Sequence, residues 1–218
     1  MKGLLLAGLL SLLFISGCSD GQDNTLFNRG IYLLVDTSGT YTKELAKAQQ
    51  IINYTLAKLY AGDTFVVASI DTGSFSEKDI VAKVTFDDRP SKANQQKRLF
   101  QEQVGQYVKQ VKSSSYTDIT GGVLQATEFL NEKNTRDKTI LIFSDLKEEL
   151  KEGYVRDIPL SLQGFDVVAL NVTKLRSDNI DPREYMNRLE KWENLVEAGG
   201  GQWKIINDLE QLDKLIQY

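Results

Sequence analysis

The stretch IYLLVDTSGT, residues 31–40, is the most informative segment of this 218-residue chain. Its first half, Ile31 to Val35, is an unbroken apolar run of the length of one strand, and such runs are typical of strands buried on both faces of a sheet. Its second half places one carboxylate and two hydroxyls, from Asp36, Ser38 and Thr40, at alternate positions. We therefore expect a buried strand whose carboxyl end opens into an oxygen-rich loop.

On the rest of the chain, apolar strands and amphipathic helices alternate. The hydrophobic spacing predicts strands at 30–35, 64–70, 80–86, 139–143, 165–172 and 202–206. Helices are predicted at 41–61, 91–112, 120–133, 182–198 and 207–217, with room for a short helix near 158–163. No helix separates the second strand from the third, so these two should pair antiparallel at a sheet edge. The pattern predicts an α/β fold: a doubly wound, mostly parallel sheet with one antiparallel edge strand and helices on both faces.

The N-terminal segment has the composition of an export signal. Lys2 precedes an apolar run from Leu4 to Ile15, which is shorter than the about 20 residues that a membrane span needs. The run ends in Ile-Ser-Gly-Cys, which resembles the lipobox of bacterial lipoproteins. We predict a signal peptide over 1–17, a lipidated Cys18 with a polar tether over 18–28, and one domain over 29–218. An ordinary cleaved signal and an uncleaved anchor are the alternatives.

The lipobox reading places the protein in the bacterial cell envelope, anchored to a membrane by lipid on Cys18. Ser19, rather than aspartate, follows the cysteine, which by analogy favours the periplasmic side of the outer membrane in double-membraned bacteria. Several acyl chains hold a protein at a membrane stably, whereas one chain does not. The domain itself should contain no cysteine, because Cys18 is the only one in the chain.

Composition excludes several classes of function. The chain has no histidine and only one cysteine. Zinc sites, Ser-His-Asp triads and Cys-His dyads are therefore excluded. Neither a Walker-type loop nor a Gly-x-Gly-x-x-Gly loop is present. The net charge of −4 argues against nucleic acid as a partner. Carboxylates and hydroxyls are the chemistry that is left, and the charged run 147–152 is expected to be a solvated helix face.

Oxygen-bearing side chains follow two of the predicted strands. Asp36, Ser38 and Thr40 follow the first strand, Asp145 follows the strand at 139–143, and Thr117 precedes the helix at 120. Ligands of such sheets bind beyond the carboxyl ends of the strands, where the strand order reverses. If the two strands are neighbours there, the three loops converge.

Hydroxyl and carboxylate oxygens are ligands that Mg²⁺ or Mn²⁺ prefers. With only two carboxylates in the set, the ion would keep a net positive charge and an exchangeable position. An acidic side chain of a partner protein can then complete its coordination shell.

In the pattern of these residues, the chain resembles the von Willebrand factor type A domain and its metal-ion-dependent adhesion site. The family's Asp-x-Ser-x-Ser stands here as Asp36-Thr37-Ser38-Gly39-Thr40, its separate threonine as Thr117, and its later aspartate as Asp145. The resemblance implies direct metal contacts from Ser38, Thr40 and Thr117, with Asp36 and Asp145 near the ion, partly through water. Leu146 departs from the glycine usual after the aspartate, and Ser115-Tyr116 depart from the small glycines usual before the threonine.

Each candidate ligand also has a plain structural role open to it. Aspartate, serine and threonine are favoured helix caps, so all five residues could cap the helices or turns that follow them. Asp71 and Asp118 lie near the same edge, and for these two a turn or cap role is expected. A metal-free version of the fold would then serve as a structural component of an envelope assembly.

An enzyme is the remaining alternative. The stretch from Asp36 to Thr40 differs at one position from the Asp-x-Asp-Gly-Thr of haloacid dehalogenase-like phosphatases, which use magnesium. The differing residue is Ser38, whose hydroxyl cannot act as a general acid and base near neutral pH. The downstream strand ends in Asn171-Val172-Thr173, without the acid pair that those enzymes need. We therefore predict a non-enzymatic, membrane-anchored protein-binding module.

Overall fold

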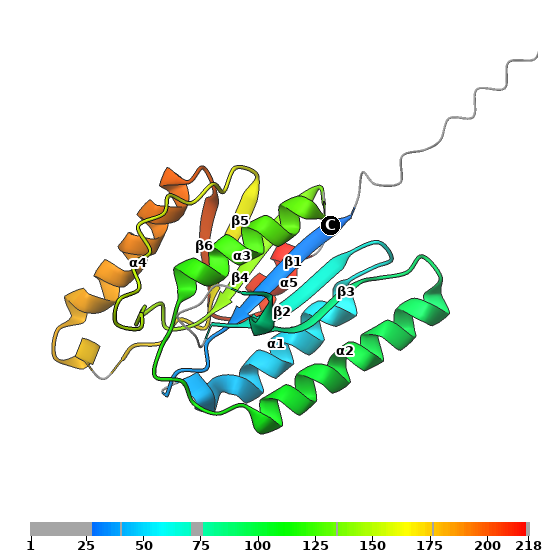
Figure 1. Ribbon diagram of the computed structural model, residues 1–218, viewed down its shortest axis with the longest axis horizontal. Helices are drawn as coiled ribbons and strands as arrows, with labels where there is room; N and C mark the ends of the chain where they lie inside the picture. The colour runs from blue at the N-terminus through cyan, green and yellow to red at the C-terminus, as the bar shows by residue number, and fades with distance from the viewer. Residues whose placement is uncertain (1–27, 40, 71–75, 134, 176, 217–218) are drawn as a thin grey trace, which may run out of the picture.

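The computed structural model describes residues 28–216 except 40, 71–75, 134 and 176. A six-stranded sheet in the order β3-β2-β1-β4-β5-β6 forms the centre of the fold (Figure 1). Its strands are β1 (Arg29–Val35), β2 (Thr64–Ser69), β3 (Ile80–Thr85), β4 (Asp137–Phe143), β5 (Phe165–Leu170) and β6 (Gln202–Ile206). Only β3 runs antiparallel, at the edge beside β2, and every other pairing is parallel. The predicted fold class is confirmed.

Helices cover both faces of the sheet because the strands in its middle are apolar on both faces. All seven residues of β1 are buried, and its side chains alternate between two cores. Ile31, Leu33 and Val35 pack with α1 (Leu45–Lys58), α2 (Pro90–Gln110) and α5 (Leu209–Ile216). Tyr32 and Leu34 pack on the other face with α3 (Ile119–Glu132) and α4 (Pro182–Ala198). Short 3₁₀ turns lie at Tyr41–Glu44, Glu77–Asp79 and Ser177–Asn179.

The connection from β4 to β5 differs from the prediction. Every residue of 144–164 is described and none is helical, so the short helix near 158–163 and the helix face at 147–152 are both wrong. Pro159 disfavours a helical conformation at the residue before it. Leu160 and Leu162 instead bury their side chains beside α4, and the Leu162 amide donates to the Gly199 carbonyl at 2.7 Å. The segment is a non-helical strap that is tied to its surroundings by contacts such as these, beside short local turns of its own.

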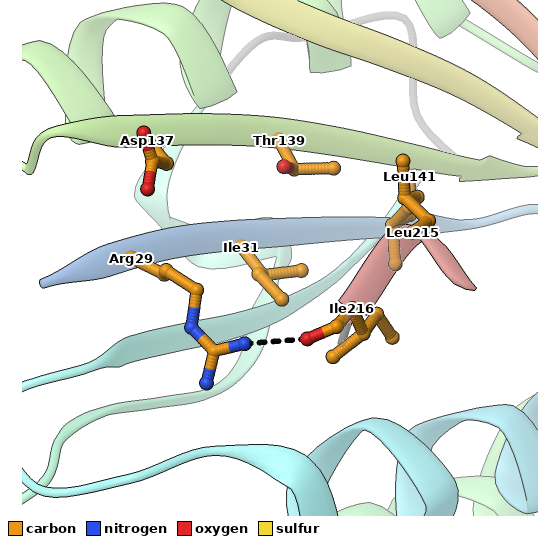
Figure 2. Close-up of a pocket in the computed structure, with 7 residues that line it drawn as sticks. All are labelled: Arg29, Ile31, Asp137, Thr139, Leu141, Leu215 and Ile216. Carbon is orange, nitrogen blue, oxygen red and sulfur yellow. Dashed lines mark hydrogen bonds between the residues drawn. The ribbon is translucent and has the colours of Figure 1, made fainter. Parts of the chain in front are cut away.

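A buried arginine anchors the amino end of β1. The Arg29 guanidinium pairs with Asp63 at 2.6 Å and donates to the Lys58 carbonyl at 3.0 Å. It also donates to the Ile216 carbonyl at 2.7 Å, as Figure 2 shows within a small pocket beneath α5. A cation at a helix C-terminus is favourable because that end carries partial negative charge. Arg29 therefore ties the start of β1 to the ends of α1 and α5.

Candidate metal centre

The loops after β1 and β4 leave the sheet side by side. These two strands are parallel neighbours, and Val35 at the end of β1 pairs with Phe143 at the end of β4. The Asp36 amide continues the ladder by donating to the Phe143 carbonyl at 3.0 Å. Because the two strands end at the same level, Asp36 and Asp145 are brought to one edge of the sheet. The expectation that these strands are neighbours is confirmed.

The loop before α3 is hydrogen-bonded to both of the others. The Ser114 amide donates to the Thr37 carbonyl at 2.9 Å, and Ser38 and Ser114 form a parallel bridge. Thr117 and Glu149 exchange two backbone hydrogen bonds of 2.8 and 2.9 Å. The structure thus gathers Asp36, Ser38, Thr117 and Asp145 at one edge, while Thr40 and Asp71 lie outside the described residues.

Asp36 is fully buried and held through both carboxylate oxygens. Its Oδ1 accepts the Ser38 amide at 2.7 Å, and its Oδ2 accepts the Ser144 hydroxyl at 2.7 Å. Burial raises the pKa of Asp36, and these hydrogen bonds only partly oppose that effect. Asp36 does not cap the next helix, since α1 begins at Leu45 and Glu44 occupies its N-cap position. Sequence reasoning missed Ser144, for which the only signal was its place beside Asp145.

Asp145 shares this buried environment. Its Oδ1 accepts the Lys147 amide at 2.8 Å, which forms a local turn and caps no helix. Burial, with a smaller contribution from the negative charge of Asp36, raises the pKa of Asp145 to about 6, against the opposing effects of that amide, of Arg188 and of Lys147. Among the described lysines and arginines, none forms an ion pair with Asp36 or Asp145. Two neighbouring carboxylates are therefore buried without a cation to balance them, which is unfavourable.

Thr117 is buried but does not cap α3. That role falls to Asp118, whose carboxylate accepts the Gly121 amide at 2.8 Å, as expected for this residue. Glu148 adds a second acceptor by taking the Thr120 amide at 2.8 Å. Arg156 pairs with Asp118 at 2.5 Å and fastens the strap to this loop. Thr117 is thus left at the edge beside Asp36 and Asp145, with its backbone held by Glu149.

The donor set fits a hard divalent cation. Within the described residues, no three or more histidine, cysteine, aspartate or glutamate side chains gather as a metal site, which leaves two carboxylates and neighbouring hydroxyls. Carboxylates near hydroxyl oxygens suit Mg²⁺ or Mn²⁺. A bound cation would favour the ionised form of both carboxylates and so oppose the pKa increase that burial causes.

Leu146 adopts a backbone conformation that suits glycine. Its φ is 67°, in the left-handed region, although its side chain is buried in the core beside α4. A leucine in this region is less favourable than in a right-handed conformation by about 1–2 kcal/mol. At the position where the resemblance leads one to expect glycine, the leucine therefore introduces local strain next to Asp145.

The described helices do not include a membrane span. None of them is both long and apolar enough to cross a bilayer. The predicted signal peptide, Cys18 and the tether up to residue 27 lie outside the described residues.

Comparison with known proteins identifies the fold by its shape. No protein-family model matches the chain, and no curated protein matches it in sequence. A von Willebrand factor type A protein from Catenulispora acidiphila superimposes with a TM-score of 0.51 and 17% identity, over 87% of this chain and 41% of that one. The pilus adhesin SpaC from Lactobacillus rhamnosus GG superimposes with a TM-score of 0.53 and 11% identity, over 87% and 29%.

This chain matches less than half the length of either of those proteins, and at such identities the likeness concerns the fold alone. The sheet order, the antiparallel edge strand and the two helical layers agree with it. The chain therefore has the fold of a von Willebrand factor type A domain.

Proposed function

We propose that this protein is a non-enzymatic protein-binding module that uses a divalent metal ion, Mg²⁺ or Mn²⁺. The proposed ligands are Asp36, Ser38, Thr40, Thr117 and Asp145. The observation that carries the proposal is the pair of buried carboxylates, Asp36 and Asp145, which lie at the carboxyl edge of the sheet and form no ion pair with any described residue. A divalent cation is the simplest partner that balances both charges at once.

The charge of the site decides what it binds. The hydroxyls of Ser38, Thr40 and Thr117 are neutral, and by the resemblance Asp36 and Asp145 reach the ion partly through water, so the direct ligands of the ion do not fully neutralise its charge. When bound, the ion supplies an electrophilic centre that accepts a further oxygen ligand. The role of the protein is to orient: Ser144 and the Ser38 amide hold Asp36, and the Lys147 amide holds Asp145. An acidic side chain of a partner protein fits the remaining position.

The proposed anchor and the proposed site lie at opposite ends of β1. Lipid on Cys18 would tether the protein in the cell envelope through residues 18–28, which join the fold at Arg29. Asp36 follows the other end of this seven-residue strand, about 23 Å further along. The tether would therefore join the domain at the end of β1 that is far from the proposed metal site, which leaves that site free for a partner.

Isothermal titration of residues 19–218 with Mg²⁺ and Mn²⁺ tests the metal site directly. We expect binding that Asp36→Asn abolishes while the circular dichroism spectrum stays unchanged. Partner capture from detergent-solubilised envelope, with and without EDTA, then tests the acidic partner. Absence of binding by either ion at millimolar concentration, with or without that partner, would leave the metal-free structural role in its place.

A further inference from the structure

Helix α4 contacts the backbone of the loop that carries Asp145. The Arg188 Nε donates to the Asp145 carbonyl at 3.2 Å, and the Trp192 Nε1 donates to the Leu146 carbonyl at 3.1 Å. Arg188 and Trp192 are four residues apart and so lie on the same face of the helix. Two consecutive carbonyls of the loop are therefore held from one helix face.

These two carbonyls flank the strained position. Leu146 has a φ of 67°, and its amide donates to the Ser144 hydroxyl at 3.0 Å. A leucine does not keep this conformation by local preference, so other contacts must hold it there. Hydrogen bonds to the peptide groups on both sides of Leu146 restrain the backbone there. They therefore restrain the direction in which the Asp145 side chain leaves the backbone.

Arg188 is itself held by a buried carboxylate. Its two terminal nitrogens donate to the two oxygens of Asp178, each at 2.8 Å. Asp178 is buried and also accepts the Leu175 amide at 2.6 Å. A continuous set of hydrogen bonds thus runs from the 3₁₀ turn after β5, through Arg188, to the Asp145 carbonyl.

We propose that α4 is a clamp that sets the position of Asp145 for metal binding, with Arg188 as its principal positioning residue. Arg188 acts through the backbone and does not touch the ion. The role in metal affinity rests on the proposed function. It follows that a displacement of α4 lowers the metal affinity without altering any metal ligand.

Arg188→Lys in the full chain, purified in detergent, is the main test. Lysine keeps the positive charge but loses the planar donors that reach Asp178 and Asp145 together. We expect the dissociation constants of Mg²⁺ and Mn²⁺ to rise about 10- to 100-fold, as when outer-shell partners of metal ligands are removed. Arg183→Lys is the matched control, because Arg183 pairs with Asp181 at the start of the same helix and has an 85% exposed side chain. The affinity of the Arg183→Lys chain for Mg²⁺ and Mn²⁺ should change less than about twofold.

Further measurements separate positioning from a general loss of structure. In the metal-free chain, hydrogen exchange at the Leu146 and Lys147 amides should quicken in Arg188→Lys and not in Arg183→Lys. Trp192→Phe removes one donor together with three ring atoms of a buried side chain and should weaken metal binding in the same direction, so in folded protein it carries the test if Arg188→Lys fails to fold. Leu146→Gly should reduce the effect of Arg188→Lys on affinity, because glycine adopts the left-handed conformation unaided.

The failures of the two proposals look different. If the unaltered chain binds no metal, the proposed function fails, and unchanged amide exchange in Arg188→Lys would then overturn the clamp as well. If the unaltered chain binds metal but folded Arg188→Lys and Trp192→Phe bind it equally well, the clamp alone is overturned. Equal weakening in Arg183→Lys would also overturn it.

Discussion

The two ends of β1 both bury charged side chains, but in opposite arrangements. At the amino end, Asp63 pairs with the Arg29 guanidinium at 2.6 Å and accepts amides from Arg29 and Tyr60 at 2.9 and 2.8 Å. At the carboxyl end, Asp36 and Asp145 are buried near each other, and burial raises the pKa of both. Hydroxyls and amides surround these two carboxylates, and no described lysine or arginine forms an ion pair with them.

The difference separates a structural ion pair from the proposed metal site. At the amino end the protein supplies both charges and most of the hydrogen bonds, so this end is complete in itself. At the carboxyl end, no described lysine or arginine forms an ion pair with either carboxylate, and in the proposed function a metal ion supplies the opposite charge. The same contrast gives four experiments, and in two of them removing a charge has opposite consequences at the two ends.

Arg29→Met should have the largest effect, because it leaves the Asp63 carboxylate buried without its partner. We expect the free energy of unfolding to fall by about 3–5 kcal/mol in urea denaturation. The metal affinity of the folded protein should stay the same, since the change lies at the far end of β1. A loss below 1 kcal/mol would show that the two ends do not differ in the way described.

Asp145→Asn should have the opposite effect on the metal-free chain. The pKa of Asp145 in the folded protein is about 6, above its ordinary value of 3.8, so the folded state binds the proton more tightly than the unfolded state. The contribution of Asp145 to the stability of the metal-free chain should therefore fall as the pH rises from about 4 to about 6, by on the order of 3 kcal/mol.

Asparagine removes this titration, so the variant should be the more stable protein at pH 7.5 in EDTA and should bind no metal. Urea denaturation across pH 4 to 8 measures both curves. A variant less stable than the unaltered chain at pH 7.5 in EDTA would contradict the assignment of Asp145 as an unbalanced charge.

Added metal should stabilise the chain by slightly less than the effect expected for the titration of Asp145. At a free Mg²⁺ concentration 100 times the dissociation constant measured at pH 7.5, we expect a gain of about 2.7 kcal/mol. The gain at the same concentration should shrink at pH 5, where protons compete for Asp145. Arg29→Met should show the full gain and Asp145→Asn none, as measured by thermal unfolding with and without EDTA. An equal gain in Asp145→Asn would place the ion elsewhere.

Ser144→Ala should have the smallest effect of the four. It removes the hydroxyl that donates to Asp36 and accepts the Leu146 amide, while the carboxylate stays in place. We expect a loss of about 1 kcal/mol in stability, as for a typical hydrogen bond, together with a several-fold weaker metal affinity. Thr139→Ala, on β4 near the amino end, is the control and should leave the metal affinity unchanged. If both variants bind metal equally well, Ser144 has no part in orienting Asp36.

The local pattern of side chains determined most of the fold. Apolar runs with no polar face predicted the buried strands β1 and β2, and the lack of a helix before β3 predicted its antiparallel place at the edge. The helix α4 and the strand β6 begin and end at the residues predicted for them. These features depend on periodicity and chain connectivity, which can be read along the sequence.

The arrangement around the candidate site could not be predicted from the sequence, because it depends on tertiary contacts. The alternation of strands and helices does not reveal which strand lies beside β1, yet the pairing of Val35 with Phe143 is what brings Asp36 and Asp145 together. The charged run after Leu146 has residues that favour a helix, but long-range contacts hold it in a loop, where Glu149 pairs with Thr117. The contact between Arg188 of α4 and Asp145 could not be predicted either. The two residues are 43 positions apart in the sequence and meet only through tertiary packing. Residue types thus set which chemistry the chain can carry, and the strand order decides which of those residues meet.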